Sequence, residues 1–221
     1  MSAAQPAREA GDLPAPLPIF PLSGVLLLPK GRLPLHIFEP RYRAMTRDAL
    51  AGPGVIGMIQ PLDADEGGAQ PRVYGVGCAG RITGCRKTAD GRYYYILIGL
   101  CRFTIVEELP PHDGYRRVMP DWHRFAADRG DESDSSVDRL RLAEALRRYS
   151  AAHGIAVDWA AIDSAPSAGM VTSLAMLCPF APSEKQVLLE APDLAERSRV
   201  LTTLLEMDVT GTNGPGRQRA H

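Results

Sequence analysis

The hydrophobic pattern of this chain changes abruptly at an acidic segment, and this change constrains the fold more than any other feature. Before the segment, short apolar runs separated by Gly and Pro are typical of β-strands. Residues 128–136 hold four acidic residues, three serines and no apolar side chain, as linkers do. Beyond them, apolar residues recur at helical spacing. The pattern therefore predicts an α+β chain, with a β domain followed by a helical bundle. We expect a flexible leader, the β domain, an acidic linker, the helical domain and a flexible tail at residues 1–15, 16–123, 124–136, 137–208 and 209–221.

Apolar runs of strand length make up the expected β domain. They lie at Leu17–Phe20, Val25–Leu28, Leu33–Ile37, Val55–Ile59, Val73–Val76 and Tyr115–Trp122. Arg81–Lys87 and Arg92–Ile98 flank an Asp90-Gly91 pair, which predicts a hairpin with a type I′ turn. One helix is expected to interrupt the strands, because Pro40 suits a first helical position and Gly52-Pro53 ends the apolar pattern.

The second half shows helical periodicity. Leu142, Leu146 and Tyr149 share one helix face, and Ser135 and Asp138 before them have the spacing of a capping box. A later stretch is apolar nearly all round and predicts a central, buried helix through Met170, Leu174, Leu177 and Cys178. Further helices are expected from Pro182 to Glu190 and after a cap formed by Asp193 and Glu196.

Two short motifs look chemical, but their surroundings argue against catalysis or nucleotide binding. Residues 75–80 match G-x-G-x-x-G, yet a strand is expected after them where a dinucleotide site needs a helix. Pro166-Ser167-Ala168-Gly169 resembles the surroundings of the nucleophilic serine in Lon-type Ser-Lys proteases, where a lysine must serve as base. Lys185 is closer in sequence to this serine than the lysine of that protease family is, and it lies on another expected helix. We therefore interpret the motif as the start of a helix capped by Ser164.

Other functional classes lack their sequence signals. No Walker-type phosphate loop is present, and the five histidines show no metal-binding pairing. The four cysteines lack zinc spacing and are expected to be reduced and buried. No apolar run approaches the ~18 residues of a membrane span. The net charge is −1, with a basic excess in the β domain and an acidic excess in the helical domain, so we do not expect nucleic acid as the main partner.

Several separated segments agree in order with one known family. They are Leu17–Leu22, Leu33–Tyr42, Val76–Ile82, Asp90–Tyr93, Gly99–Phe103 and Leu174–Pro192. Over residues 16–208 the chain resembles the Lon substrate-binding domain. The resemblance implies a PUA-like β pseudo-barrel with one inserted helix, then a helical bundle, and recognition of unfolded or tagged protein segments. It implies no ATPase or protease within this chain, no cofactor or metal, and a cytoplasmic protein. Work as an adaptor for a separate Lon or other AAA+ protease is compatible with it, and the oligomeric state is left open.

Two groups of residues are candidates for function or for holding the fold. Exposed apolar residues would contact a peptide, and we name Val25, Leu27, Tyr93 and Tyr95 for this role. The residues that carry the resemblance are expected to be structural: His36, Phe38, Glu39, Pro40, Arg41, Tyr42, Gly80, Arg81 and Arg102. Within this group, Arg41 or Arg102 is expected to pair with Glu39.

Peptide recognition is the leading hypothesis, and two others stay open. The PUA-like barrel suggests RNA binding by fold analogy, which a continuous stripe of arginines would favour. A small-molecule sensor or an unrecognised enzyme would need a deep pocket with converging polar groups.

Overall fold

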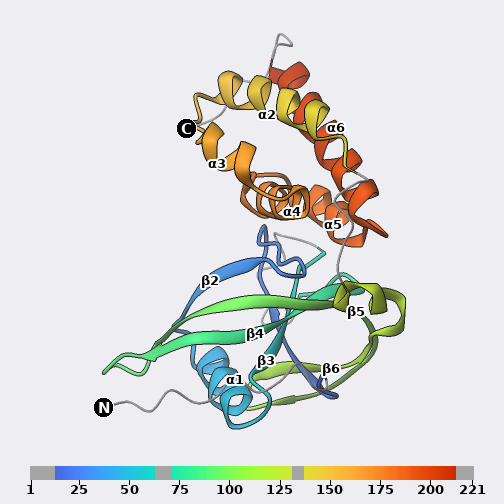
Figure 1. The fold of residues 1–221 in the computed structure, drawn as a ribbon. Helices are drawn as coiled ribbons and strands as arrows, with labels where there is room; N and C mark the ends of the chain where they lie inside the picture. Colours follow the sequence, from blue (N-terminus) through green and yellow to red (C-terminus); the bar gives the residue numbers. More distant parts are fainter. Residues whose placement is uncertain (1–12, 63–70, 131–136, 213–221) are drawn as a thin grey trace.

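The computed structural model describes residues 13–62, 71–130 and 137–212. Six strands form one sheet, in the order β2-β5-β4-β3-β1-β6. Their bounds are β1 Leu17–Pro21, β2 Arg32–Ile37, β3 Val55–Ile59, β4 Val76–Lys87, β5 Tyr93–His112 and β6 Tyr115–Asp121. The first half of the 20-residue β5 pairs with β2 and β4, and its second half pairs with β6. This double pairing closes the sheet into a ring and confirms the expected pseudo-barrel (Figure 1).

The inserted helix α1, Pro40–Ala51, begins and ends where the sequence predicts. It lies on the side of the barrel away from the other α-helices (Figure 1). These helices are α2 Arg139–His153, α3 Trp159–Ser164, α4 Ser167–Leu177, α5 Pro182–Glu190 and α6 Leu194–Thr212. Helices α4 and α5 are nearest to the sheet, and α2 packs against α6 farther away (Figure 1). The leader and tail fall almost entirely outside the described residues, although α6 continues to Thr212.

The segment Val25–Leu28, expected to be a strand, is irregular instead. Its residues from Leu26 onward are buried in the core, so burial rather than sheet pairing explains the apolar run. The chain passes so close to β5 that a Cβ on Gly99 would be 1.9 Å from the carbonyl oxygen of Leu28. Only glycine allows this close approach. Next to it, the amide of Lys30 donates to the Gly99 carbonyl, and the amide of Gly99 donates to the Gly31 carbonyl.

The two Asp-Gly pairs of the β domain form different turns. A type I′ turn needs positive φ at both of its central residues. In the described chain Gly91 has a positive φ but Asp90 does not, so the predicted type I′ turn is wrong. The β4–β5 hairpin has a longer turn, in which Gly91 donates to the Thr88 carbonyl and Thr88 donates to the Arg92 carbonyl. Asp113 and Gly114 both have positive φ, at 46° and 82°, and connect β5 to β6 in the conformation expected at Asp90.

The first residues of the expected linker form regular structure. His123–Arg129 forms a 3-10 helix, η1, that packs on β5 and buries Phe125 and Asp128. The cap of α2 is Asp138, whose side chain accepts from the amide of Arg141, while Ser135 lies outside the described residues. Ser164 ends α3 instead of capping α4, which begins after Pro166.

A shared hydrophobic cluster joins the barrel and the C-terminal helices. It contains Leu28 and Cys101 from the β domain together with Leu174, Leu188 and Leu201 from the helices. A smaller cluster around Phe103 lies among the strands β1, β3, β4, β5 and β6. The glycines of the G-x-G-x-x-G match lie in or next to β4, where a Cβ on Gly77 would be 2.6 Å from the Met58 carbonyl oxygen. The motif is therefore a packed strand, as the sequence indicated.

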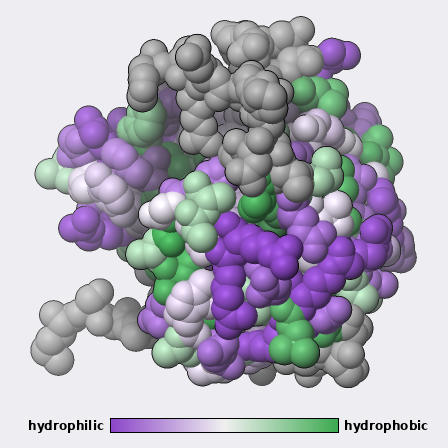
Figure 2. All heavy atoms as spheres, turned by 90° about the horizontal axis from the view of Figure 1, so that it is seen from above, coloured by the Kyte–Doolittle hydropathy of each residue, from purple (hydrophilic) through white to green (hydrophobic). Residues whose placement is uncertain are grey.

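From the helical side, the surface is mainly hydrophilic with small, separate hydrophobic patches (Figure 2). Within the described part of the chain, no helix combines the length and apolar character needed to cross a membrane.

Candidate functional site

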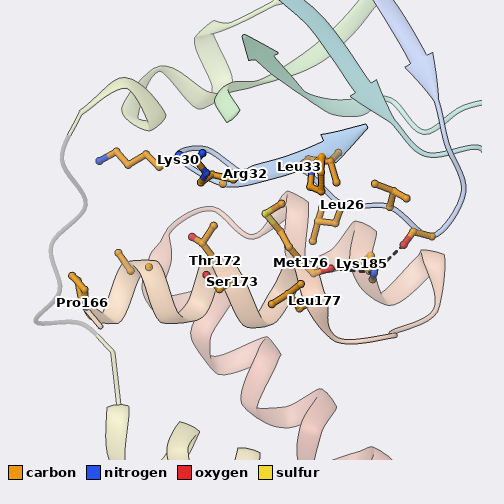
Figure 3. Close-up of a pocket in the computed structure, with 16 residues that line it drawn as sticks. Leu26, Lys30, Arg32, Leu33, Pro166, Thr172, Ser173, Met176, Leu177 and Lys185 are labelled. Carbon is orange, nitrogen blue, oxygen red and sulfur yellow. Dashed lines mark hydrogen bonds between the residues drawn. The ribbon is translucent and has the colours of Figure 1, made fainter. Parts of the chain in front are cut away.

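A groove of about 550 Å³ lies between the chain leading into β2 and the exposed side of α4 (Figure 3). Its volume is within the range of protein ligand sites. One wall comes from the β domain and consists of Gly24, Val25, Leu26, Lys30, Gly31, Arg32, Leu33 and Pro34. The other wall comes from the helices and consists of Pro166, Ala168, Gly169, Thr172, Ser173, Met176, Leu177 and Lys185. The groove is thus formed where the helices pack against the barrel.

Helix α4 supplies apolar side chains both to the core and to the groove. Met170, Leu174 and Cys178 are buried, as the helical spacing predicts. Leu177 is 79% exposed, so the prediction that this helix is buried on all sides is wrong there. The uniform apolarity of the stretch has a physical reason, because one face packs in the core and the other lines the groove. An apolar face left in water is a common mark of an interaction site.

Two glycines set the shape of the groove. A Cβ on Gly31 would be 2.4 Å from the sulfur of Met176, so the two walls touch at this point. A Cβ on Gly169 would meet no atom within 4 Å, so α4 is open to the groove there. A side chain placed at Gly169 would therefore occupy the groove without displacing the protein.

Of the residues that the structure describes, those that are charged and line the groove are all basic: Lys30, Arg32 and Lys185. Lys185 is 5% exposed, and its ammonium donates to the carbonyl of Gly24 at 2.8 Å and to that of Met176 at 3.4 Å. Burial lowers the pKa of Lys185, since desolvation disfavours the charged form. These bonds connect α5, the end of α4 and the turn at Gly24 (Figure 3).

The four residues expected to contact a peptide lie in different environments. Val25 is half-buried and lines the groove. Leu27, Tyr93 and Tyr95 are buried in the core, at 1%, 8% and 3% exposure, and offer no surface to a partner. Sequence reasoning missed Met176, Leu177 and Gly169, although the nearly all-apolar α4 stretch was the available signal.

The segment before α1 forms a second exposed surface. His36 stacks on Tyr94 with ring centroids 4.3 Å apart, and Phe38 is 57% exposed beside His36. The guanidinium of Arg86 lies 5.3 Å from the Tyr94 ring centroid. Tyr94 thus points to the opposite side of β5 from its buried neighbours, as strand alternation predicts.

The start of α1 is held by local contacts. Glu39 occupies the N-cap position without a side-chain cap bond, and Pro40 is the first helical residue. Arg41, and not Arg102, pairs with Glu39, with Nη2 and Oε2 2.9 Å apart. Tyr42 packs on Phe20 with ring centroids 4.2 Å apart.

The other residues that carry the family resemblance make their contacts within the barrel and at its junction with the helices. Gly80 leaves no room for a side chain, because a Cβ there would be 2.8 Å from Leu27. Arg81 donates to the carbonyl of Pro53 at 3.1 Å. Arg102 is 2% exposed and pairs with Asp128 across a 2.7 Å contact. Its guanidinium also donates to the carbonyl oxygens of Leu189, in the last turn of α5, and of Ala191 and Pro192, just after that helix.

The side chains that could bind a metal ion or act in nucleophilic catalysis form hydrogen bonds within the protein. Asp48, His112 and Asp113 bring three potential metal-ligand atoms within 4.8 Å of one another. The guanidinium of Arg47 donates hydrogen bonds of 2.8 Å to the carboxylates of Asp48 and Asp113, and the bond to Asp48 lowers the pKa of that side chain. The buried Ser167 hydroxyl accepts from Arg139 at 3.4 Å, whereas Lys185 donates to main-chain carbonyls. This geometry does not prepare Ser167 for nucleophilic attack.

The cysteines differ in exposure. All four are free, and Cys78, Cys101 and Cys178 are buried as expected, but Cys85 is exposed. Burial raises the pKa of both Cys101 and Cys178 to about 11, so these thiols stay protonated at neutral pH.

Comparisons with known proteins agree with this architecture. Residues 16–207 match the model of the ATP-dependent protease La (LON) substrate-binding domain. Two curated relatives, Lon protease of Anaeromyxobacter dehalogenans and Lon protease 2 of Myxococcus xanthus, are each 34% identical over 99 residues, which cover 43% of this chain and 12% of the relative. The matched region is thus a small part of those proteins.

Two solved structures share the fold. A Lon N-terminal domain protein from Xanthomonas campestris has a TM-score of 0.59 at 24% identity. The N-terminal domain of Lon protease from the Mycobacterium avium complex has a TM-score of 0.60 at 18% identity. In both cases the match covers 86% of this chain and 97% of the other. With the family model matching most of its length, the chain belongs to the LON substrate-binding domain family.

Proposed function

We propose that this chain is a non-catalytic module that binds unfolded or tagged protein segments in the groove between β2 and α4. The observation that carries the proposal is the exposed apolar wall of α4, above all Leu177 at 79% exposure, in a domain whose family is described as substrate-binding. Unfolded segments present apolar side chains that folded proteins bury, and such side chains are what this wall would remove from water.

The shape of the groove supports broad recognition. Its apolar residues are aliphatic or thioether side chains, including Val25, Leu33 and Met176, and Met adapts to differently shaped partners. Backbone polar groups at the free edge of β2 are a further generic means of holding an extended segment. We therefore propose weak binding to many sequences.

A pair of matched substitutions tests the proposal. Leu177→Ser removes an exposed leucine from the groove, and Leu140→Ser removes one that is 87% exposed on α2, outside the groove. Burying a leucine side chain contributes ~1.5–3 kcal/mol, so the first change should weaken binding of a fluorescent apolar peptide about tenfold or more. The second should leave the affinity unchanged. Equal affinities of both variants and the wild type, measured by fluorescence anisotropy, would reject the groove as the site.

We further propose an adaptor role, in which the bound segment is passed to a separate Lon or other AAA+ protease in the cytoplasm. The family match supports a relation to Lon in general. The test is addition of the chain to a purified protease and a substrate that the groove binds. Faster degradation that requires Leu177 supports the adaptor role, and an unchanged rate refutes it.

RNA binding remains a second candidate because of the surface formed by His36, Tyr94 and Arg86. Stacked, exposed aromatic rings beside a guanidinium can hold unpaired bases. Capture of lysate components on the immobilised protein, with and without ribonuclease, separates the two functions. Loss of the retained proteins after ribonuclease treatment would favour RNA.

A further inference from the structure

Among the described residues, the charged side chains that line the groove have a single sign. They are the basic residues Lys30, Arg32 and Lys185, and this described lining contains no carboxylate. This bias is local, because the chain as a whole has a net charge of −1. A concave, partly apolar surface lined by one sign of charge concentrates ligands of the opposite sign.

Lys185 is the most constrained of the three cations. Its side chain is 5% exposed, and the described residues around it supply two carbonyl acceptors but no ion pair. An ammonium has three N–H donors, so one of them has no acceptor among the described residues. Carbonyl dipoles compensate a buried charge less completely than a carboxylate does. A ligand carboxylate would complete the bonding of Lys185.

The three cations are separated by apolar residues. In Figure 3, Lys30 and Arg32 lie on one side of Leu26, Leu33 and Met176, and Lys185 lies on the other. Arg32 is exposed and forms no ion pair within the described chain. Carboxylates at both ends of a segment would therefore meet cations while its middle contacts the apolar wall. A single terminal carboxylate would meet only one end.

We infer that the groove selects protein segments in which Asp or Glu residues flank a short apolar core. This inference rests on the proposed function and adds the charge pattern of the substrate. A polypeptide fits better than a nucleic acid, because none of the lining residues is aromatic and the groove offers no platform for base stacking.

Peptides with one apolar core and different flanks test the inference. All have an acetylated N-terminus and an amidated C-terminus, so that only the flanking Glu, Gln or Lys side chains differ in charge. We expect the Glu peptide to bind about fivefold more tightly than the Gln peptide, and the Lys peptide to bind most weakly. The Glu preference should shrink as salt is raised.

Two variants at Gly169 locate the effect. The position is open to the groove, so Gly169→Glu and Gly169→Lys place opposite charges at the same point without a clash. The ratio of Glu-peptide to Gln-peptide affinity should fall in G169E and rise in G169K, and Arg32→Gln should lower it as well. Melting curves check that each variant is folded.

The outcomes are separable. Equal affinities for the Glu and Gln peptides, with both bound in a Leu177-dependent way, would overturn the charge selection and keep the proposed function. No binding of any peptide would overturn both. A single-stranded RNA that binds more tightly than the Glu peptide, and displaces it, would also overturn the inference and assign the basic lining to phosphates.

Discussion

Replacing Asp128 with Ala should destabilise the protein more than any surface change. Asp128 and Arg102 are 3% and 2% exposed, and the carboxylate accepts bonds from the Arg102 guanidinium and from its main-chain amide at 2.9 Å. Asp128→Ala leaves the Arg102 cation buried against carbonyl oxygens and the Phe125 ring, with no carboxylate among its described partners. Breaking a buried pair in this way costs about 3–5 kcal/mol. A typical domain is stable by ~5–15 kcal/mol, so much of the total would be lost.

Urea unfolding followed by circular dichroism measures the effect. Asp128→Asn serves as a milder second variant in case the Ala variant does not fold. The double variant Arg102→Met, Asp128→Leu removes both charges and should be more stable than Asp128→Ala, since no unpaired cation remains. If Asp128→Ala lowered the free energy of unfolding by less than about 1 kcal/mol, the pair would not be buried from solvent, because water would have to reach Arg102 in the folded state.

Three further predictions concern single positions. Gly99→Ala should abolish or severely weaken folding, because its Cβ would be 1.9 Å from the Leu28 carbonyl oxygen, and a melting temperature close to that of the wild type would contradict this close approach. In the native protein a thiol reagent should label Cys85 well before Cys78, Cys101 and Cys178, and mass spectrometry showing equal labelling would be inconsistent with their burial. The bond from Arg47 lowers the pKa of Asp48 in the folded state, so Asp48 contributes stability above its unfolded pKa of 3.8, and this contribution is lost as the pH falls through the lower folded value. Asp48→Asn should therefore flatten the acid side of a plot of stability against pH, and an unaltered slope would argue against the pair.

Local signals in the sequence predicted those parts of the fold that local chemistry determines. Pro40 and Gly52 mark the two ends of α1, since both act on the backbone nearby. The hydrophobic run Val25–Leu28 was assigned the wrong structure because a buried irregular segment and a strand have the same composition. What distinguishes them is the glycine at position 99, far along the chain, which admits the Leu28 carbonyl.

The candidate site depended still more on long-range packing. The groove exists only where the segment before β2 meets α4, and no local pattern brings Gly31 against Met176. Helical spacing placed Leu177 with the core residues, yet the helix ends there and the side chain faces solvent. Either Arg41 or Arg102 was expected to pair with Glu39, and Arg41 does so. The buried partner of Arg102 is Asp128, within a segment whose composition is typical of a solvated acidic linker.

Methyl NMR during a peptide titration tests most directly whether the groove binds protein segments. Methyl groups of Val, Leu and Met are present in the groove at Val25, Leu33, Met176 and Leu177, and on other surfaces at Val106, Leu140 and Met207. We expect an apolar peptide with Glu flanks to shift the resonances of the groove methyls and to leave those of the other three unchanged. Shifts confined to methyls outside the groove, or no shift at saturating peptide, would contradict it.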